Sequence, residues 1–145
     1  VPAVNLVASP DGSQVAIGQT DGLALLDVAT GDAEMLAQGS RVEGVVWDPT
    51  GRRLAWEELD PESGQALAIV TADLESRTEG MVGGSGDRRL LSFDPSGRYL
   101  AVASLDADGR WAPRVIPIEG GPTGTLDWSL EGAALPGSHF WWVVP

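Results

Sequence analysis

The sequence predicts an all-β fold built from repeated antiparallel units, and three observations support this prediction. Glycine (19 residues) and proline (10 residues) are plentiful and scattered along the 145-residue chain. Short apolar runs lie between them, which is typical of strands separated by turns. A turn motif also recurs at intervals that suit a four-stranded unit.

The motif is an apolar residue, then Ser or Asp, Pro, any residue and Gly, then a short apolar strand. Three good copies span residues 8–17, 47–56 and 93–102, and a degraded fourth spans residues 128–135. The marker residues are 39, 46 and 35 residues apart at Pro10, Pro49, Pro95 and Leu130. These intervals bracket the roughly 40–45-residue period of a four-stranded β-propeller blade.

Each copy of the motif predicts a β-hairpin. Proline fixes φ at the second position of a tight turn, where its missing N–H is harmless. The Asp or Ser before it can accept a backbone N–H of the turn. The glycine two residues after it supplies the positive φ that a hairpin with a bulge requires.

The remainder of each unit also divides into strands. We expect further strands over residues 15–19, 23–28, 34–37, 53–59, 66–71, 78–82, 99–105 and 111–118. Pro113 and Pro117 weaken the last of these, which we expect to be bulged or near a sheet edge. No segment predicts a helix, since the nearest candidates, residues 34–37 and 74–77, are too short.

The repeats resemble those of TolB-like, WD-like propellers, whose motif reads aromatic-Ser-Pro-Asp-Gly before an apolar strand. Residues 9–12 match it fully, with Ala8 at the aromatic position, and the second and third copies have Asp in place of Ser. True WD repeats fit less well. The Trp47-Asp48 pair precedes the turn, and His139, the only histidine, does not form the Gly-His pair of those repeats.

The resemblance covers the whole chain and implies about three and a half four-stranded antiparallel blades. Approximate blade boundaries are 1–40, 41–84, 85–125 and a partial unit at 126–145. Complete propellers have four to eight blades, so we expect missing sequence, a second copy or another chain to complete the ring. The chain begins at Val1 without an initiator Met, and we expect it to be processed, trimmed or a fragment.

Composition narrows the possible functions. The net charge of −12 makes nucleic acid an unfavourable partner. All nine basic residues are arginine, and the chain has no cysteine, which excludes disulfides and thiolate chemistry. No apolar run is long enough to span a bilayer.

Catalytic and metal motifs are weak, so we expect no catalytic residue, no cofactor and no metal site. A serine triad would depend on His139, and residues 83–86 lose the nucleophile-elbow spacing at Asp87. Acidic turns at residues 60–62 and 106–109 carry only the opening of a calcium loop. Hairpin geometry alone explains them. The Glu57-Glu58 pair is predicted to lie on a strand surface.

The tryptophans divide into core and contact candidates. Trp47, Phe93 and Trp128 occupy equivalent repeat positions and are predicted to pack between blades. Trp141 and Trp142 are adjacent and must point to opposite faces of a strand. One of that pair faces solvent or a partner unless another blade covers it.

Blade topology predicts a binding face. The loops joining second to third strands lie on the same face as the connections between blades, and such loops carry function on rigid scaffolds. These loops span residues 19–22, 39–41, 59–64, 83–88 and 105–110. The candidate binding residues on this face are Arg41, Asp60, Glu62, Asp87, Arg88, Asp106, Asp108 and Trp111.

The resemblance implies a non-catalytic protein-interaction or scaffolding module of a bacterial exported or cell-envelope protein. Its expected location is periplasmic, secreted or lipid-anchored, with the cytoplasm left open. One alternative is the propeller that controls substrate access in a larger hydrolase, such as a prolyl-oligopeptidase-like peptidase. Another is a calcium- or glycan-binding propeller. Fold alone does not separate these functions.

Overall fold

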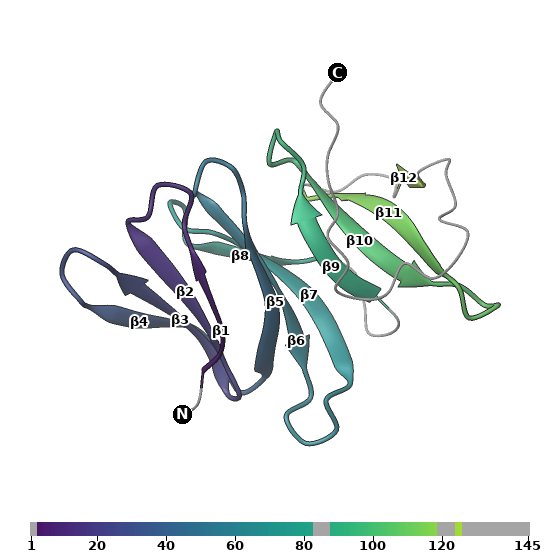
Figure 1. Ribbon diagram of the computed structural model, residues 1–145, viewed down its shortest axis with the longest axis horizontal. Coiled ribbons are helices and arrows are strands. Elements are labelled where there is room, and N and C mark those ends of the chain that lie inside the picture. The colour runs from purple at the N-terminus through teal and green to yellow at the C-terminus, as the bar shows by residue number, and fades with distance from the viewer. Residues whose placement is uncertain (1–2, 83–87, 119–123, 126–145) are drawn as a thin grey trace.

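The computed structural model describes residues 3–82, 88–118 and 124–125. The described strands form three four-stranded antiparallel sheets, each made of strands consecutive in sequence (Figure 1). We call them blades 1 to 3. The last predicted unit, residues 126–145, lies outside the described residues.

Strand bounds are as follows. Blade 1 contains β1 (Ala3–Ala8), β2 (Gln14–Gln19), β3 (Gly22–Asp27) and β4 (Ala33–Gln38). Blade 2 contains β5 (Arg41–Trp47), β6 (Arg53–Leu59), β7 (Ala66–Asp73) and β8 (Thr78–Met81). Blade 3 contains β9 (Arg88–Phe93), β10 (Tyr99–Leu105), β11 (Trp111–Pro117) and β12 (Gly124–Thr125).

The predicted strands are all present, with ends shifted by one residue at most. β11 pairs with β10 without a register shift, from Tyr99 opposite Pro117 to Leu105 opposite Trp111. Its other side pairs with β12 only at Arg114 and Val115. The two prolines of β11 therefore lie near the edge of their sheet, where a missing N–H is tolerated.

The three proline turns have the predicted geometry. The glycines two residues after proline have φ values of 74°, 75° and 71° at Gly12, Gly51 and Gly97. The residue before proline accepts the N–H five residues ahead, as in the bond from Arg53 N to Asp48 Oδ1 at 2.9 Å. This bond closes each hairpin before the next strand begins.

A hydroxyl and a carboxylate also bond across the proline of every turn, but in two different orders. In blade 1 the Ser9 hydroxyl donates to Asp11 at 2.7 Å. In blade 2 the Thr50 hydroxyl donates back to Asp48 at 2.7 Å. Blade 3 follows blade 2, since Ser96 donates to Asp94 at 2.5 Å. One bond is therefore kept while its two partners exchange places.

Successive proline turns also touch one another. A Cβ added at Gly97 would lie 3.0 Å from Asp48 Oδ2, whereas a Cβ added at Gly12 would meet no atom within 4 Å. The Asp48 side chain is buried and held by its own turn, so it cannot move away cheaply.

This contrast predicts the effects of two alanine substitutions. Gly12→Ala should lower the free energy of unfolding by about 1–2 kcal/mol, because alanine is strained at positive φ. Gly97→Ala should cost measurably more, since it adds a clash with Asp48 to the same strain. Urea unfolding followed by circular dichroism measures both, and equal losses would show that the turns do not press on each other.

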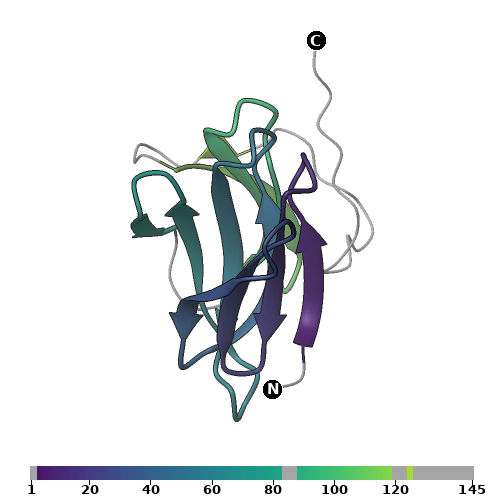
Figure 2. The same cartoon turned by 90° about the vertical axis from the view of Figure 1, so that its left-hand side faces the viewer.

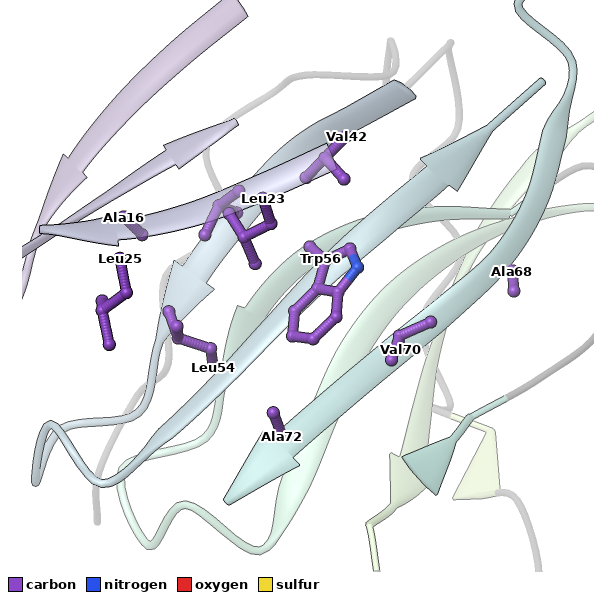
Figure 3. Close-up of a cluster of buried hydrophobic side chains, with 10 residues drawn as sticks. Ala16, Leu23, Leu25, Val42, Leu54, Trp56, Ala68, Val70 and Ala72 are labelled. Atoms are coloured by element: carbon purple, nitrogen blue, oxygen red, sulfur yellow. The ribbon is translucent and has the colours of Figure 1, made fainter. Parts of the chain in front are cut away.

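The blades stack face to face, one behind another, as Figure 2 shows with blade 1 toward the viewer. Two clusters of buried apolar side chains fill the spaces between them. The first joins blades 1 and 2 through residues such as Leu23, Leu54 and Trp56 (Figure 3). The second joins blades 2 and 3 and includes Ile69 and Phe93.

The predicted packing of the repeat aromatics is confirmed where the structure describes it. Trp47 packs against the first cluster, and its indole Nε1 donates to the Val7 carbonyl of blade 1 at 3.0 Å. Phe93, at the same repeat position, is buried in the second cluster. Trp128, Trp141 and Trp142 lie outside the described residues.

Candidate binding face

The connections between strands fall alternately at two ends of the blades. One end carries the proline turns. The other carries the loops between second and third strands and the connection from blade 1 to blade 2, at residues 20–21, 39–40, 60–65 and 106–110. We call this second end the loop end. Figure 1 shows its β6–β7 loop at the bottom of the molecule.

Two of the predicted binding carboxylates at the loop end are used inside their own turns. Asp60 Oδ1 accepts the backbone N–H groups of Glu62 and Ser63 at 3.1 and 2.7 Å. Asp106 Oδ1 accepts those of Asp108 and Arg110 at 2.9 and 2.8 Å. The Ser63 N–H is the main cause that holds the pKa of Asp60 below its ordinary value.

The next acidic side chains in the same loops face solvent. Glu62 and Asp108 are exposed and take part in the turns through their backbone N–H groups. Asp21, in the matching loop of blade 1, is exposed as well. Each blade therefore presents one exposed carboxylate at the loop end, on a turn fixed by backbone hydrogen bonds.

A chain of ion pairs lies beside these loops and crosses from blade 2 to blade 3. Arg41 Nη2 is 2.5 Å from Glu43 Oε1, and Glu43 Oε2 is 3.9 Å from Arg89 Nη2. Arg89 Nε is in turn 3.3 Å from Glu57 Oε2. The Arg41 and Arg89 side chains are 39% and 35% exposed, so both guanidinium groups remain partly accessible to a partner.

Glu57 is the buried end of this chain, which corrects the prediction that it lies on a strand surface. It is 2% exposed, because it shares a face of β6 with Ala55 and stands opposite Ile69, in the space between blades 2 and 3. A middle blade is covered on both faces and has no solvent face for such a residue.

Two contacts hold the Glu57 carboxylate in this space. Oε1 accepts the backbone N–H of Leu90 in blade 3. Oε2 lies within ion-pair distance of Arg89, but not in hydrogen-bond alignment with it. Burial raises the pKa of Glu57, and the Leu90 N–H and Arg89 act in the opposite direction.

A glycine in β5 makes room for this buried carboxylate. The pairing of β5 with β6 shifts between Glu43 and Val46, and Gly44 in the resulting bulge has a φ of 60°. A Cβ added at Gly44 would lie 3.2 Å from Glu57 Cδ. The bulge therefore lets the Glu57 side chain cross β5 on its way to blade 3.

The structure brings together only part of the predicted binding set. Arg41 belongs to the ion-pair chain, and Trp111 begins β11 with a half-buried side chain. Asp87 and the Arg88 side chain lie outside the described residues. Among the described side chains, no hydrogen bond or ion pair joins the Asp60 loop to the Asp106 loop.

Sequence reasoning missed three members of the ion-pair chain, which are Glu43, Glu57 and Arg89. The available signal was Gly44, because an isolated glycine in a strand indicates a bulge or a close approach.

Two searches of the described residues concern metals and membranes. Nowhere in residues 3–82, 88–118 and 124–125 do three Asp, Glu or His side chains gather in a way that could hold a metal ion. The same part of the chain contains no helix with the length and apolar character needed to cross a membrane.

No protein-family profile and no curated protein matches the sequence. Solved structures do match it. TolB from Acinetobacter baumannii has a TM-score of 0.66 at 18% identity, over 88% of this chain and 32% of that one. A putative TolB from Agrobacterium tumefaciens has a TM-score of 0.65 at 18% identity, over 88% of this chain and 48% of that one.

The β-propeller domain of the Trilobed protease from Pyrococcus furiosus has a TM-score of 0.59 at 14% identity, over 82% of this chain and 42% of that one. The described chain is therefore a partial β-propeller, as the sequence predicted. Its blades have the fold found in TolB and in this protease propeller. The chain spans between a third and a half of the proteins it matches.

Proposed function

We propose that this chain is a non-catalytic protein-interaction module that binds its partner at the loop end. The observation that carries the proposal is the row of exposed carboxylates Asp21, Glu62 and Asp108, one on each blade. Their turns are closed by strand pairing and backbone hydrogen bonds, so a partner meets charges that are already positioned. Prearranged groups of this kind reduce the entropy lost on binding.

The chemistry of this end favours a protein partner with basic side chains facing the carboxylate row. The chain carries a net charge of −12, so its long-range field attracts such a partner. Arg41 and Arg89, partly exposed beside the row, would accept carboxylates of the same partner. A surface with both signs of charge selects one orientation of the bound protein.

Charge reversal tests this proposal. The partner is captured from an extract of cells on immobilised wild-type chain and is then titrated against single variants. Glu62→Arg and Asp108→Arg should each weaken its binding by about tenfold or more, the range of a well-placed interface charge.

The matched control is Asp32→Arg, which makes the same change in net charge on an exposed residue at the proline-turn end. It should weaken binding far less than the loop-end variants. If all three variants bound the captured protein alike, the loop end would not be the binding face.

A second candidate is the propeller domain of a larger peptidase, which the fold similarity to the Trilobed protease propeller favours. The test is peptidase activity of the full-length gene product that contains this chain, with the isolated chain as the inactive control. We also propose an extracytoplasmic location, which the resemblance to TolB-like repeats supports. Fractionation of cells that produce the full-length protein tests it.

A further inference from the structure

Blade 1 has one flat side that no described blade covers. Blade 2 packs on the other side through the first apolar cluster, which takes in Val7, Ala16 and Leu25 of blade 1. Neighbouring residues of a strand point to opposite faces, so the side chains between these point away from blade 2. We call the side facing away from blade 2 the open face of blade 1.

The open face consists of two apolar rows that cross all four strands in register. Their members are uncharged and are Leu6, Ile17, Ala24 and Met35 in one row and Ala8, Val15, Leu26 and Ala33 in the other. Several are half-buried or exposed, and Leu6 is 65% exposed. A large apolar patch on an acidic protein indicates a contact surface.

The repeat shows what such a face packs against. Counted from the motif prolines, Val15 and Ile17 occupy the positions of Leu54 and Trp56 in blade 2. Both blade 2 residues are 0% exposed, because blade 1 covers them.

The same equivalence holds at the inner strand and in blade 3. Leu6 corresponds to Val45, which is 4% exposed. In blade 3 the matching residues Leu100 and Val102 are 0% exposed against blade 2. The open face is thus the face by which every other described blade receives the blade before it.

The share of a propeller that this chain supplies indicates where the covering blade comes from. The chain aligns with 42% of the Pyrococcus furiosus propeller domain and 48% of the putative TolB. Two copies therefore supply about as much chain as one such propeller. A head-to-tail pair related by a twofold axis closes, and it covers the open face of both copies at once.

We propose that two copies of this chain assemble head to tail, with the open face of blade 1 in each copy packed against the C-terminal end of the blade row in the other. This contact goes beyond the proposed loop-end function, since it uses the flat side of blade 1. Its core is apolar, while the charge lies elsewhere on the chain. Because each copy carries a net charge of −12, added salt should strengthen the association by screening repulsion.

The oligomeric state of the purified 145-residue chain tests the proposal. Sedimentation and light scattering should give twice the mass of one chain at high protein concentration, with a dissociation constant that falls as salt is added. Leu6→Asp should raise this constant about tenfold or more, because it places a charge in the apolar contact.

The matched control is Met81→Asp, at a residue 73% exposed on the outer strand of blade 2. Neither side chain is buried within one copy, so neither variant should unfold the chain, and circular dichroism confirms this. The control should dimerise like the wild type.

Chemical labelling gives a second readout. The chain has no cysteine, so Leu6→Cys introduces a single thiol, whose reaction with a maleimide should slow as the protein concentration rises. A chain that stays monomeric at every concentration and salt would overturn the proposal, because another segment or protein would then cover the open face. Open-ended polymers, or equal weakening by Met81→Asp, would overturn it as well.

Discussion

Trp56→Ala is expected to lower the free energy of unfolding by about 3–5 kcal/mol, the range for removing a fully buried large side chain. The indole is 0% exposed and lies between blades 1 and 2, near Leu23 and Leu54 (Figure 3). Its Nε1 also donates to Glu58 at 3.3 Å, and this bond is lost with the ring. Urea unfolding monitored by far-ultraviolet circular dichroism measures the loss.

Trp111→Ala is the matched control, because it removes the same side chain from a half-buried position outside both apolar clusters. Its cost should be much smaller. If both variants lost the same stability, the contact between blades 1 and 2 would not be the main support of the described fold.

Glu57→Gln is expected to stabilise the chain at neutral pH. Burial raises the pKa of Glu57 in the folded protein, so folding disfavours its ionised form. The stability linked to this group is complete below its ordinary pKa of 4.5 and is lost as the pH rises through the higher folded value. Glutamine never ionises, and its amide oxygen can still accept the Leu90 N–H, so the variant avoids this loss.

The measurement is the free energy of unfolding of both proteins as a function of pH. The difference between them should grow as the pH rises above 4.5, the ordinary pKa of a glutamate. Asp11 and Asp73, with pKa values lowered to about 2, titrate alike in both proteins and cancel. Lower stability of the glutamine variant at neutral pH would mean that the Arg89 ion pair outweighs burial.

Glu57→Ala separates the hydrogen bond from the charge. It leaves the Leu90 N–H without its acceptor, which costs about 1–3 kcal/mol for a buried backbone donor. This loss should persist at low pH, where the wild-type carboxyl is neutral. A loss that vanished there would show that the Leu90 bond contributes little.

The turns of this protein could be predicted from sequence because their causes are local. Proline fixes one φ, and Gly12, Gly51 and Gly97 supply the positive φ two residues later. The strand ends followed from these turns, and the blade period followed from the distance between them. Neither step needs any contact between distant residues.

The ion-pair chain could not be predicted in the same way. It depends on which face of β6 meets blade 3, and the alternation of residues within one strand does not reveal this. Glu57 follows Trp56 and was taken for a solvent-facing neighbour of a buried ring. In a blade covered on both sides, the alternate face is a second interior, and a charged residue there needs a partner from the next blade.

The binding face was predicted at the level of topology but not of chemistry. Antiparallel order placed the loops at one end, whereas the roles of their side chains required hydrogen-bond geometry. Asp60 and Asp106 are turn acceptors, and the exposed charges come two residues later, at Glu62 and Asp108. An acidic turn therefore contains one structural carboxylate and one that is available for contact.

The exchange of hydroxyl and carboxylate across the proline of each turn constrains how these repeats evolve. Passing from the order of blade 1 to that of blade 2 requires two substitutions. An intermediate with two hydroxyls keeps a bond across the proline, whereas one with two carboxylates places like charges at hydrogen-bond distance. Lineages should therefore cross between the two orders through Ser-Pro-Ser-Gly and avoid Asp-Pro-Asp-Gly, and the two positions should covary among homologous repeats.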